Sequence, residues 1–158
     1  MPVTIISVGK PDRALFLPAV REYARRITRF DKLTLVEVPD VQEPAGASAA
    51  QLDIVRDREG ESILARIRQD DYVVAMCIEA RQCDSLAFSD KIRALRDRSQ
   101  HMVFVIGGSL GLGQAVYRRA NETLSLSSLT FPHQLARVVL LEQLYRAYKI
   151  IANERYHK

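Results

Sequence analysis

Four short apolar runs, each of strand length, are separated along this chain by stretches whose apolar residues recur at helical spacing. The runs are Val3–Val8, Leu33–Val38, 72–78 and Met102–Ile106, and the helical patterns cover 14–29, 51–68 and 85–98. Strands that alternate with helices at this rhythm predict an α/β fold, a mostly parallel sheet with helices on both faces. No repeat or linker divides the 158 residues, so we expect one domain over residues 1–158.

The fourth apolar run ends in Gly107 and Gly108, and a short strand near residue 124 leads into a loop rich in serine and threonine, residues 125–131. Adjacent strand ends that deliver flexible loops form the small-molecule sites of α/β proteins. Glycine lets a backbone approach a ligand, and hydroxyls between apolar neighbours suit a purine-like ring. The Gly-x-Gly-x-x-Gly spacing and a P-loop lysine are missing. We expect a cofactor site here, with a plain strand-to-helix turn as the alternative.

A long helix is predicted over residues 132–153, with Pro132 at its start. Its polar side chains gather on one narrow line, while apolar residues occupy most of the remaining surface. A single chain's sheet covers one side of such a helix, so a second apolar side needs a partner. A symmetric homodimer is the simplest partner, and a helix sandwiched within one chain is the alternative.

The net charge of +4 lies entirely in the last third of the chain. Residues 107–158 hold seven lysines and arginines against three acids, whereas residues 1–106 hold sixteen of each. A basic surface beside a predicted site favours a polyanionic partner, and RNA is the obvious one. A solvated helix face is the alternative.

Other classes of site find little support. Cys77 and Cys83 have no neighbouring His or Cys cluster, which predicts free thiols and no metal site. Charges interrupt every apolar run, so no membrane span is expected. The amino terminus lacks the pattern of a signal peptide, and we expect a cytoplasmic protein. His133 is a candidate base, and the last three residues place an aromatic, an imidazole and a cation where RNA binding would use them.

Several motifs in a fixed order give the chain a family resemblance. They read FVIGGSxGL at 104–112, LSLSxLTFPHQ at 124–134, RVVLxEQxYRA at 137–147 and YHK at 156–158, with VGK at 8–10 and EVPD at 37–40. The sequence resembles the ribosomal RNA large subunit methyltransferase H family of the SPOUT superfamily over its whole length. One segment departs, because Cys77, Ala80 and Arg81 replace the acidic residue and the Gly-Lys pair usual in the family.

The resemblance implies a parallel sheet whose carboxyl-terminal part forms a trefoil knot around S-adenosylmethionine, in a homodimer. It implies methylation of N3 of a pseudouridine in 23S ribosomal RNA, on the large ribosomal subunit or the assembled 70S ribosome. The positions that it assigns to the cofactor are Met76, Gly107, Gly108, Leu126, Ser127, Ser128, Leu129, Thr130 and Phe131.

Methyl transfer to this nitrogen needs a proton acceptor and a cation that stabilises the anion left behind. We expect His133, Tyr156 or His157 to receive the proton, and Arg137 or Lys158 to supply the charge. In a dimer the tail would reach the partner's cofactor site. Two rival functions are a non-catalytic RNA-binding module and a nucleotide-binding regulatory or hydrolytic protein.

Overall fold

The computed structural model describes residues 2–158, and it contains one five-stranded sheet in the order β2-β1-β4-β3-β5 with every pair parallel. The strands are β1 (Val3–Val8), β2 (Leu33–Val38), β3 (Tyr72–Met76), β4 (Met102–Ile106) and β5 (Glu122–Leu124). The helices are α1 (Leu17–Ile27), α2 (Ala49–Leu64), α3 (Ser85–Asp97), α4 (Gln114–Arg119) and α5 (His133–Ile151). The predicted α/β class with a parallel sheet is confirmed.

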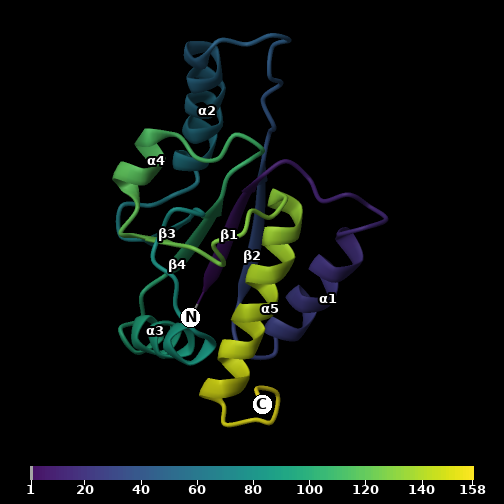
Figure 1. Ribbon diagram of the computed structural model, residues 1–158. Coiled ribbons are helices and arrows are strands. Elements are labelled where there is room, and N and C mark those ends of the chain that lie inside the picture. The colour runs from purple at the N-terminus through teal and green to yellow at the C-terminus, as the bar shows by residue number, and fades with distance from the viewer. Residues whose placement is uncertain (1) are drawn as a thin grey trace.

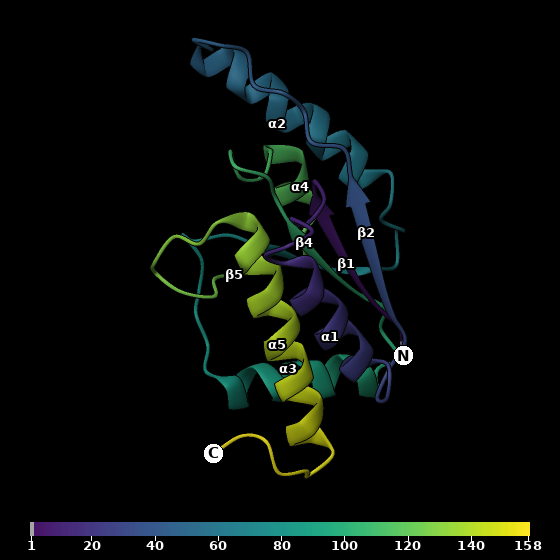
Figure 2. The same ribbon diagram turned by 90° about the vertical axis from the view of Figure 1, so that its right-hand side faces the viewer.

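Two apolar clusters cover the two faces of the sheet. Val3 and Ile5 of β1 join α1, α3 and α5 in one cluster, and Ile6 and Val8 join α2 and α4 in the other. This division follows from the two-residue period of a strand, which sends successive side chains to opposite faces. Figures 1 and 2 show α1 next to α5 and α2 next to α4, and α3 packs against α5. The prediction of helices on both faces is confirmed.

Two helix starts differ from the sequence prediction. The first helix begins at Leu17 and not at residue 14, because Asp12 Oδ1 accepts hydrogen bonds from the N–H groups of Ala14 and Leu15 and holds a turn there. α2 begins two residues earlier than predicted. Ser48 and Gln51 form a reciprocal capping box that supplies partners to the first turn.

Three further predictions are corrected in the second half of the chain: the end of a strand, the cap of a helix and the number of helices. β3 ends at Met76, two residues before the predicted end. The cap of α3 is Asp84, whose side chain accepts from the N–H of Ala87, and not Ser85. α4 was missed, because six residues behind a glycine-rich stretch show too little periodicity to indicate a helix.

The starts of three strands are joined by side chains that we call the amino-edge network. His101 precedes β4 and contacts Thr4 Oγ1 through Nε2 at 2.9 Å and Asp71 Oδ1 through Nδ1 at 2.6 Å. Asp71 Oδ2 also accepts from the N–H of Arg68 at 2.8 Å. Arg119 Nη2 donates to the carbonyls of Arg68 and Asp71, at 2.6 and 3.0 Å. The network fastens the edge of the sheet where the strands begin.

α5 runs against α1 and α3 from the end of the sheet where the strands finish to the end where they begin (Figure 1). Leu140, Leu141, Leu144 and Tyr148 on its inner side are buried. On its outer side Leu135 remains exposed. One chain therefore covers one side of α5 well and leaves an apolar position near its start in solvent, and the dimer stays a prediction.

Candidate functional site

A pocket of about 990 Å³ lies where β3, β4 and β5 end. Three segments line it: 76–79 after β3, 106–109 with Gly111 after β4, and 123–133 without Ser128 after β5. Tyr117 of α4 and Ala136 of α5 complete the wall. Ligand sites of small molecules have volumes of roughly 300–1,000 Å³, so this pocket accommodates a nucleoside-sized cofactor.

The turn after β4 requires glycine at two positions. A Cβ on Gly107 would lie 2.7 Å from the carbonyl carbon of Gly111, and Gly111 itself has φ +78°. The N–H of Gly111 donates to the carbonyl of Gly108 at 3.1 Å and closes the turn. We call residues 107–111 the glycine turn. The expected freedom of the glycines is therefore used for a tight turn whose backbone forms a wall of the pocket.

The loop at 125–131 is held by its own hydroxyls. Ser125 Oγ donates to the carbonyl of Ser127 at 2.8 Å, and Ser127 Oγ accepts from the N–H of Leu129 at 3.0 Å. The N–H of Ser125 donates to the carbonyl of Arg81 at 3.0 Å, and that of Cys77 to the carbonyl of Leu124. Ser127 thus shapes the loop, and Leu129 stands at the pocket with 70% of its surface exposed.

Two weak acids on the pocket wall, Cys77 and Tyr117, are held in their neutral form. Burial raises the pKa of the Cys77 thiol, and Glu79 raises it further against an opposing hydrogen bond from Tyr117. Burial is also the main cause of the raised pKa of the Tyr117 phenol. A thiol of raised pKa is a poor nucleophile, so the pocket is suited to binding and alignment without a covalent enzyme intermediate.

His133 is a titratable base at the pocket, together with Glu79. It stands at the first position of α5 behind Pro132 and is half-buried. Burial lowers the pKa of its imidazole, Arg137 lowers it further, and Asp40 opposes both. The imidazole is therefore neutral at pH 7 and has a free lone pair with which to accept a proton.

Arg137 does not line the pocket, although its predicted role requires a cation there. Its side chain is 2% exposed. Nη2 donates to the carbonyl of Gly9 at 2.8 Å, and Nη1 lies 3.3 Å from Glu37 Oε1. Burial lowers the pKa of the guanidinium, and Glu37 opposes that change. Arg137 thus joins α5 to the ends of β1 and β2. Its charge affects the site by lowering the pKa of His133.

The carboxyl-terminal tail also lies away from the pocket of its own chain. α5 has 19 residues, which separates its two ends by about 28 Å at 1.5 Å per residue. Beyond it, Tyr156 donates its phenol hydrogen to Glu142 Oε1 at 3.1 Å and packs edge-on against Tyr145 at 4.8 Å between ring centroids. Arg146 lies over the Tyr156 ring, and His157 Nδ1 is 3.5 Å from Arg146 Nη1.

The structure therefore assembles most of the predicted site. Together at the pocket are Met76, Gly107, Gly108, Leu126, Ser127, Leu129, Thr130, Phe131 and His133. Outside its lining are Ser128, Arg137, Tyr156, His157 and Lys158. Sequence reasoning missed Tyr117, because the short helix that carries it was missed. It also missed Glu79, whose position directly after a strand end was the available signal.

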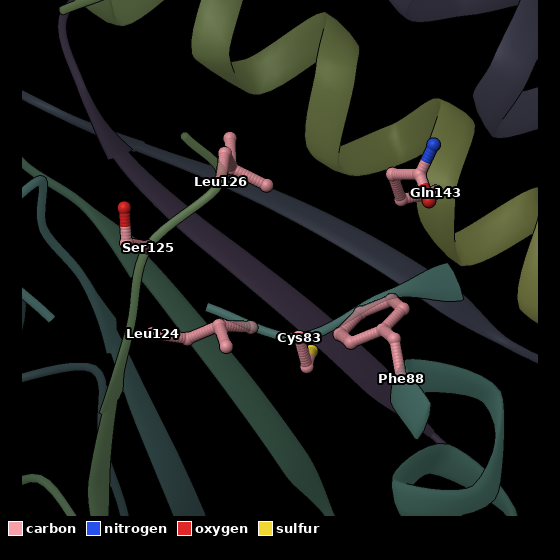
Figure 3. Close-up of a pocket in the computed structure, with 6 residues that line it drawn as sticks. All are labelled: Cys83, Phe88, Leu124, Ser125, Leu126 and Gln143. Carbon is pink, nitrogen blue, oxygen red and sulfur yellow. The ribbon is translucent and has the colours of Figure 1, made fainter. Parts of the chain in front are cut away.

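A second cavity lies on the other side of residues 124–126 and has a volume of about 50 Å³. Figure 3 shows Cys83 and Phe88 on its one side and Gln143 of α5 on the other. Its volume is too small for a nucleoside, so the large pocket is the candidate site. Across residues 2–158, no cluster of three or more His, Cys, Asp or Glu residues can hold a metal ion. Within the same range no helix is long and apolar enough to cross a bilayer.

Comparison with known proteins places the chain among methyltransferases. A family model described as "Predicted SPOUT methyltransferase" matches residues 1–157. Proteins named ribosomal RNA large subunit methyltransferase H from Ruminiclostridium cellulolyticum and Listeria monocytogenes are 44% and 43% identical, and each alignment covers 100% of both chains. A crystal structure of a probable methyltransferase from Bordetella pertussis Tohama I has a TM-score of 0.57 at 16% identity, over 92% of this chain and 93% of that one. The chain therefore belongs to the SPOUT methyltransferases and, within them, to the ribosomal RNA large subunit methyltransferase H family.

Proposed function

We propose that this protein transfers a methyl group from S-adenosylmethionine to N3 of a pseudouridine in 23S ribosomal RNA. It acts in the cytoplasm as a homodimer, on the large ribosomal subunit or the 70S ribosome. The observation that carries the proposal is the meeting of the 107–111 and 125–131 motifs at one nucleoside-sized pocket. Full-length relatives at 43–44% identity bear the name of a ribosomal RNA methyltransferase.

The residues present fit S-adenosylmethionine. Gly107 forms part of the pocket wall, where any side chain would collide with the backbone of Gly111. Leu126 and Phe131 provide apolar surface in the pocket, and Thr130 provides a hydroxyl. The glycine turn and the 125–131 loop would hold the cofactor, in the manner of the trefoil knot that the family resemblance implies. When bound, the cofactor supplies an electrophilic methyl group. The chain itself has to align the nucleobase and manage one proton.

His133 is our choice for the residue that accepts the N3 proton. It lines the pocket and its imidazole is neutral at pH 7, because burial lowers its pKa. Arg137 is engaged with Gly9 and Glu37, so we assign stabilisation of the developing anion to the exposed Lys158 of a second copy. Tyr156 and His157 accompany Lys158 into that composite site.

Apolar side chains that one chain leaves exposed near the pocket support the proposed homodimer. Leu129 at the pocket and Leu135 at the start of α5 are both exposed, and exposed apolar surface beside a site usually marks an interface. The tail lies roughly the length of α5 from its own pocket. A partner whose α5 packs antiparallel to this helix would bring its Lys158 to this pocket. The exposed Lys158 of the tail would then contact the RNA phosphates.

A calorimetric titration with S-adenosylmethionine tests the cofactor assignment. We expect saturable binding, and no heat at millimolar ligand would contradict the proposed function. A methylation assay on 23S RNA, on large subunits and on 70S ribosomes then identifies the substrate. A non-catalytic RNA-binding protein would bind RNA in a salt-dependent way and show no cofactor binding. A nucleotide-binding protein would prefer ATP or a dinucleotide.

Deletion of residues 156–158 tests the composite site. We expect S-adenosylmethionine affinity to stay within a few-fold, and methylation to fall by about 10²-fold or more, as loss of general acid–base and electrostatic groups does. The variant Tyr156→Phe is the control for packing, since it keeps the ring against Tyr145. Unchanged methylation by the deleted protein would remove the tail from the mechanism.

A further inference from the structure

Glu59 of α2 is a buried carboxyl that the proposed mechanism does not use. Its side chain is 4% exposed, and its Oε2 is buried with no hydrogen-bond partner. Its Oε1 accepts a hydrogen bond from the N–H of Val41 at 3.2 Å. Among residues 2–158, no lysine, arginine or histidine lies within ion-pair distance of it. A buried carboxylate without a cation is costly, so this group needs a reason to be there.

The glycine turn packs directly on this carboxyl. A Cβ on Gly108 would lie 3.3 Å from Glu59 Oε2, 3.5 Å from Oε1 and 3.2 Å from Val8 Cγ1. At two more glycines, α2 and the segment after β4 approach each other so closely that a Cβ would be crowded. A Cβ on Gly113 would lie 3.0 Å from the carbonyl oxygen of Arg56, and one on Gly60 would lie 3.3 Å from Val116. Figure 2 shows α2 and α4 side by side.

We propose that Glu59 is a positioning residue of the pocket: it lies between the N–H of Val41 and Gly108, and it holds the glycine turn in the shape that forms the pocket wall. Gly107 and Gly108 of this turn both line the pocket. Any movement of Gly108 off Glu59 therefore displaces that wall. The inference deepens the proposed function and rests on it for the identity of the cofactor.

The surroundings of Glu59 favour the neutral acid. Burial raises the pKa of its carboxyl above the ordinary 4.5, the hydrogen bond from Val41 opposes this, and the carboxylate of Asp40 raises the pKa further. Asp40 is the titratable group that faces it from the loop after β2, while β1 and the glycine turn present Val8 and Gly108, which do not titrate. When protonated, the Glu59 carboxyl can donate a hydrogen bond to the carboxylate of Asp40.

The pH dependence follows in sign from this shift. Because folding raises the pKa of Glu59, its contribution is fully present below pH 4.5 and is lost as the pH rises through the raised value. Above that value the carboxylate is charged and lies unpaired against Gly108. Because a charged group is more stable in water, α2 and the glycine turn then tend to separate and let solvent reach it. Affinity of the pocket for its cofactor then falls with rising pH.

Three variants separate positioning from simple packing. Glu59→Gln keeps the shape and the neutral hydrogen-bonding group at every pH, Glu59→Leu keeps the volume alone, and Glu61→Gln changes an exposed glutamate on the same helix as the control. S-adenosylmethionine affinity is measured by calorimetry from pH 5 to pH 9. The amino group of the ligand titrates in this range too, so the informative quantity is the ratio of wild-type to variant affinity at each pH.

We expect the ratio of wild-type to Glu59→Gln affinity to fall about threefold or more across this range, since one linked proton allows at most about tenfold per pH unit. Glu59→Leu should bind less tightly at every pH, and Glu61→Gln should follow the wild type. A constant ratio, or wild-type affinity in Glu59→Leu, would overturn the proposal.

Amide hydrogen exchange of residues 107–112 without ligand provides a readout that does not depend on the proposed function. At a matched pH near 5, exchange in Glu59→Gln should equal the wild type, and exchange in Glu59→Leu should be faster. At pH 9 the wild type should exchange faster than Glu59→Gln. Equal exchange in all three proteins at both pH values would contradict the positioning role. If the wild type binds no S-adenosylmethionine while these differences persist, the proposed function fails and the clamp on the turn stands.

Discussion

The two edges of this sheet are built on opposite principles. At the edge where the strands begin, Asp71 accepts from His101 and from the backbone of Arg68, and His101 reaches Thr4. At the edge where they end, Glu59 Oε2 and Arg137 Nε are buried without partners. The first edge has its hydrogen bonds satisfied and the second keeps polar atoms unsatisfied beside a large pocket. Strain and unmet hydrogen bonds concentrate at functional sites, so we expect the first edge to contribute mainly to stability and the second to ligand binding.

The largest effect is expected from Asp71→Ala, which breaks the amino-edge network. The change leaves His101 Nδ1 and the N–H of Arg68 without their acceptor. The lost hydrogen bonds and the two donors left without an acceptor should together lower the unfolding free energy by about 3 kcal/mol. Chemical denaturation measures this cost. Asp70→Ala, at the exposed neighbour, is the control and should change it by less than about 0.5 kcal/mol.

The Asp71→Ala variant also tests whether the two edges act independently of each other. We expect folded Asp71→Ala to bind S-adenosylmethionine with wild-type affinity, because its network lies at the edge of the sheet opposite the pocket. A large loss of affinity in the folded variant would show that the two edges are coupled.

A smaller change in stability, with a large change in binding, is expected for Gly107→Ala. The new Cβ would lie 2.7 Å from the backbone of Gly111, so the glycine turn must shift at a cost of about 2 kcal/mol. Cofactor affinity should fall by tenfold or more in calorimetry. Gly46→Ala is the control: its added Cβ would meet nothing within 4 Å, so any cost of its φ of +64° falls on stability and the variant should bind the cofactor normally.

The smallest effect is expected from Thr4→Val, which removes one hydroxyl from the amino-edge network and keeps the side-chain shape. Losing the hydrogen bond to His101 Nε2 should lower the unfolding free energy by about 1 kcal/mol. Thr34→Val is a matched control, since Thr34 is the register partner of Thr4 on β2 and is exposed. Equal stability of the two variants would mean that His101 obtains its hydrogen bond elsewhere.

Much of the site was predictable because it lies in continuous motifs. The glycine turn and the 125–131 loop each follow a strand, and parallel strands bring their carboxyl ends to one edge. Arg137 was predicted as one of two candidate cations for the site, but it lies outside the lining of the pocket. Its guanidinium instead meets Gly9 and Glu37, 128 and 100 residues away in the chain.

The sequence by itself determined the α/β class, the parallel sheet, the helices on both faces and the family, because these depend on local periodicity and on contiguous motifs. Only the tertiary structure decided which side chains meet across long separations in the chain: Glu59 against Gly108, Arg137 against Gly9, and the tail against its own α5 instead of its own pocket. Such contacts follow from strand order and helix packing, which no local pattern encodes.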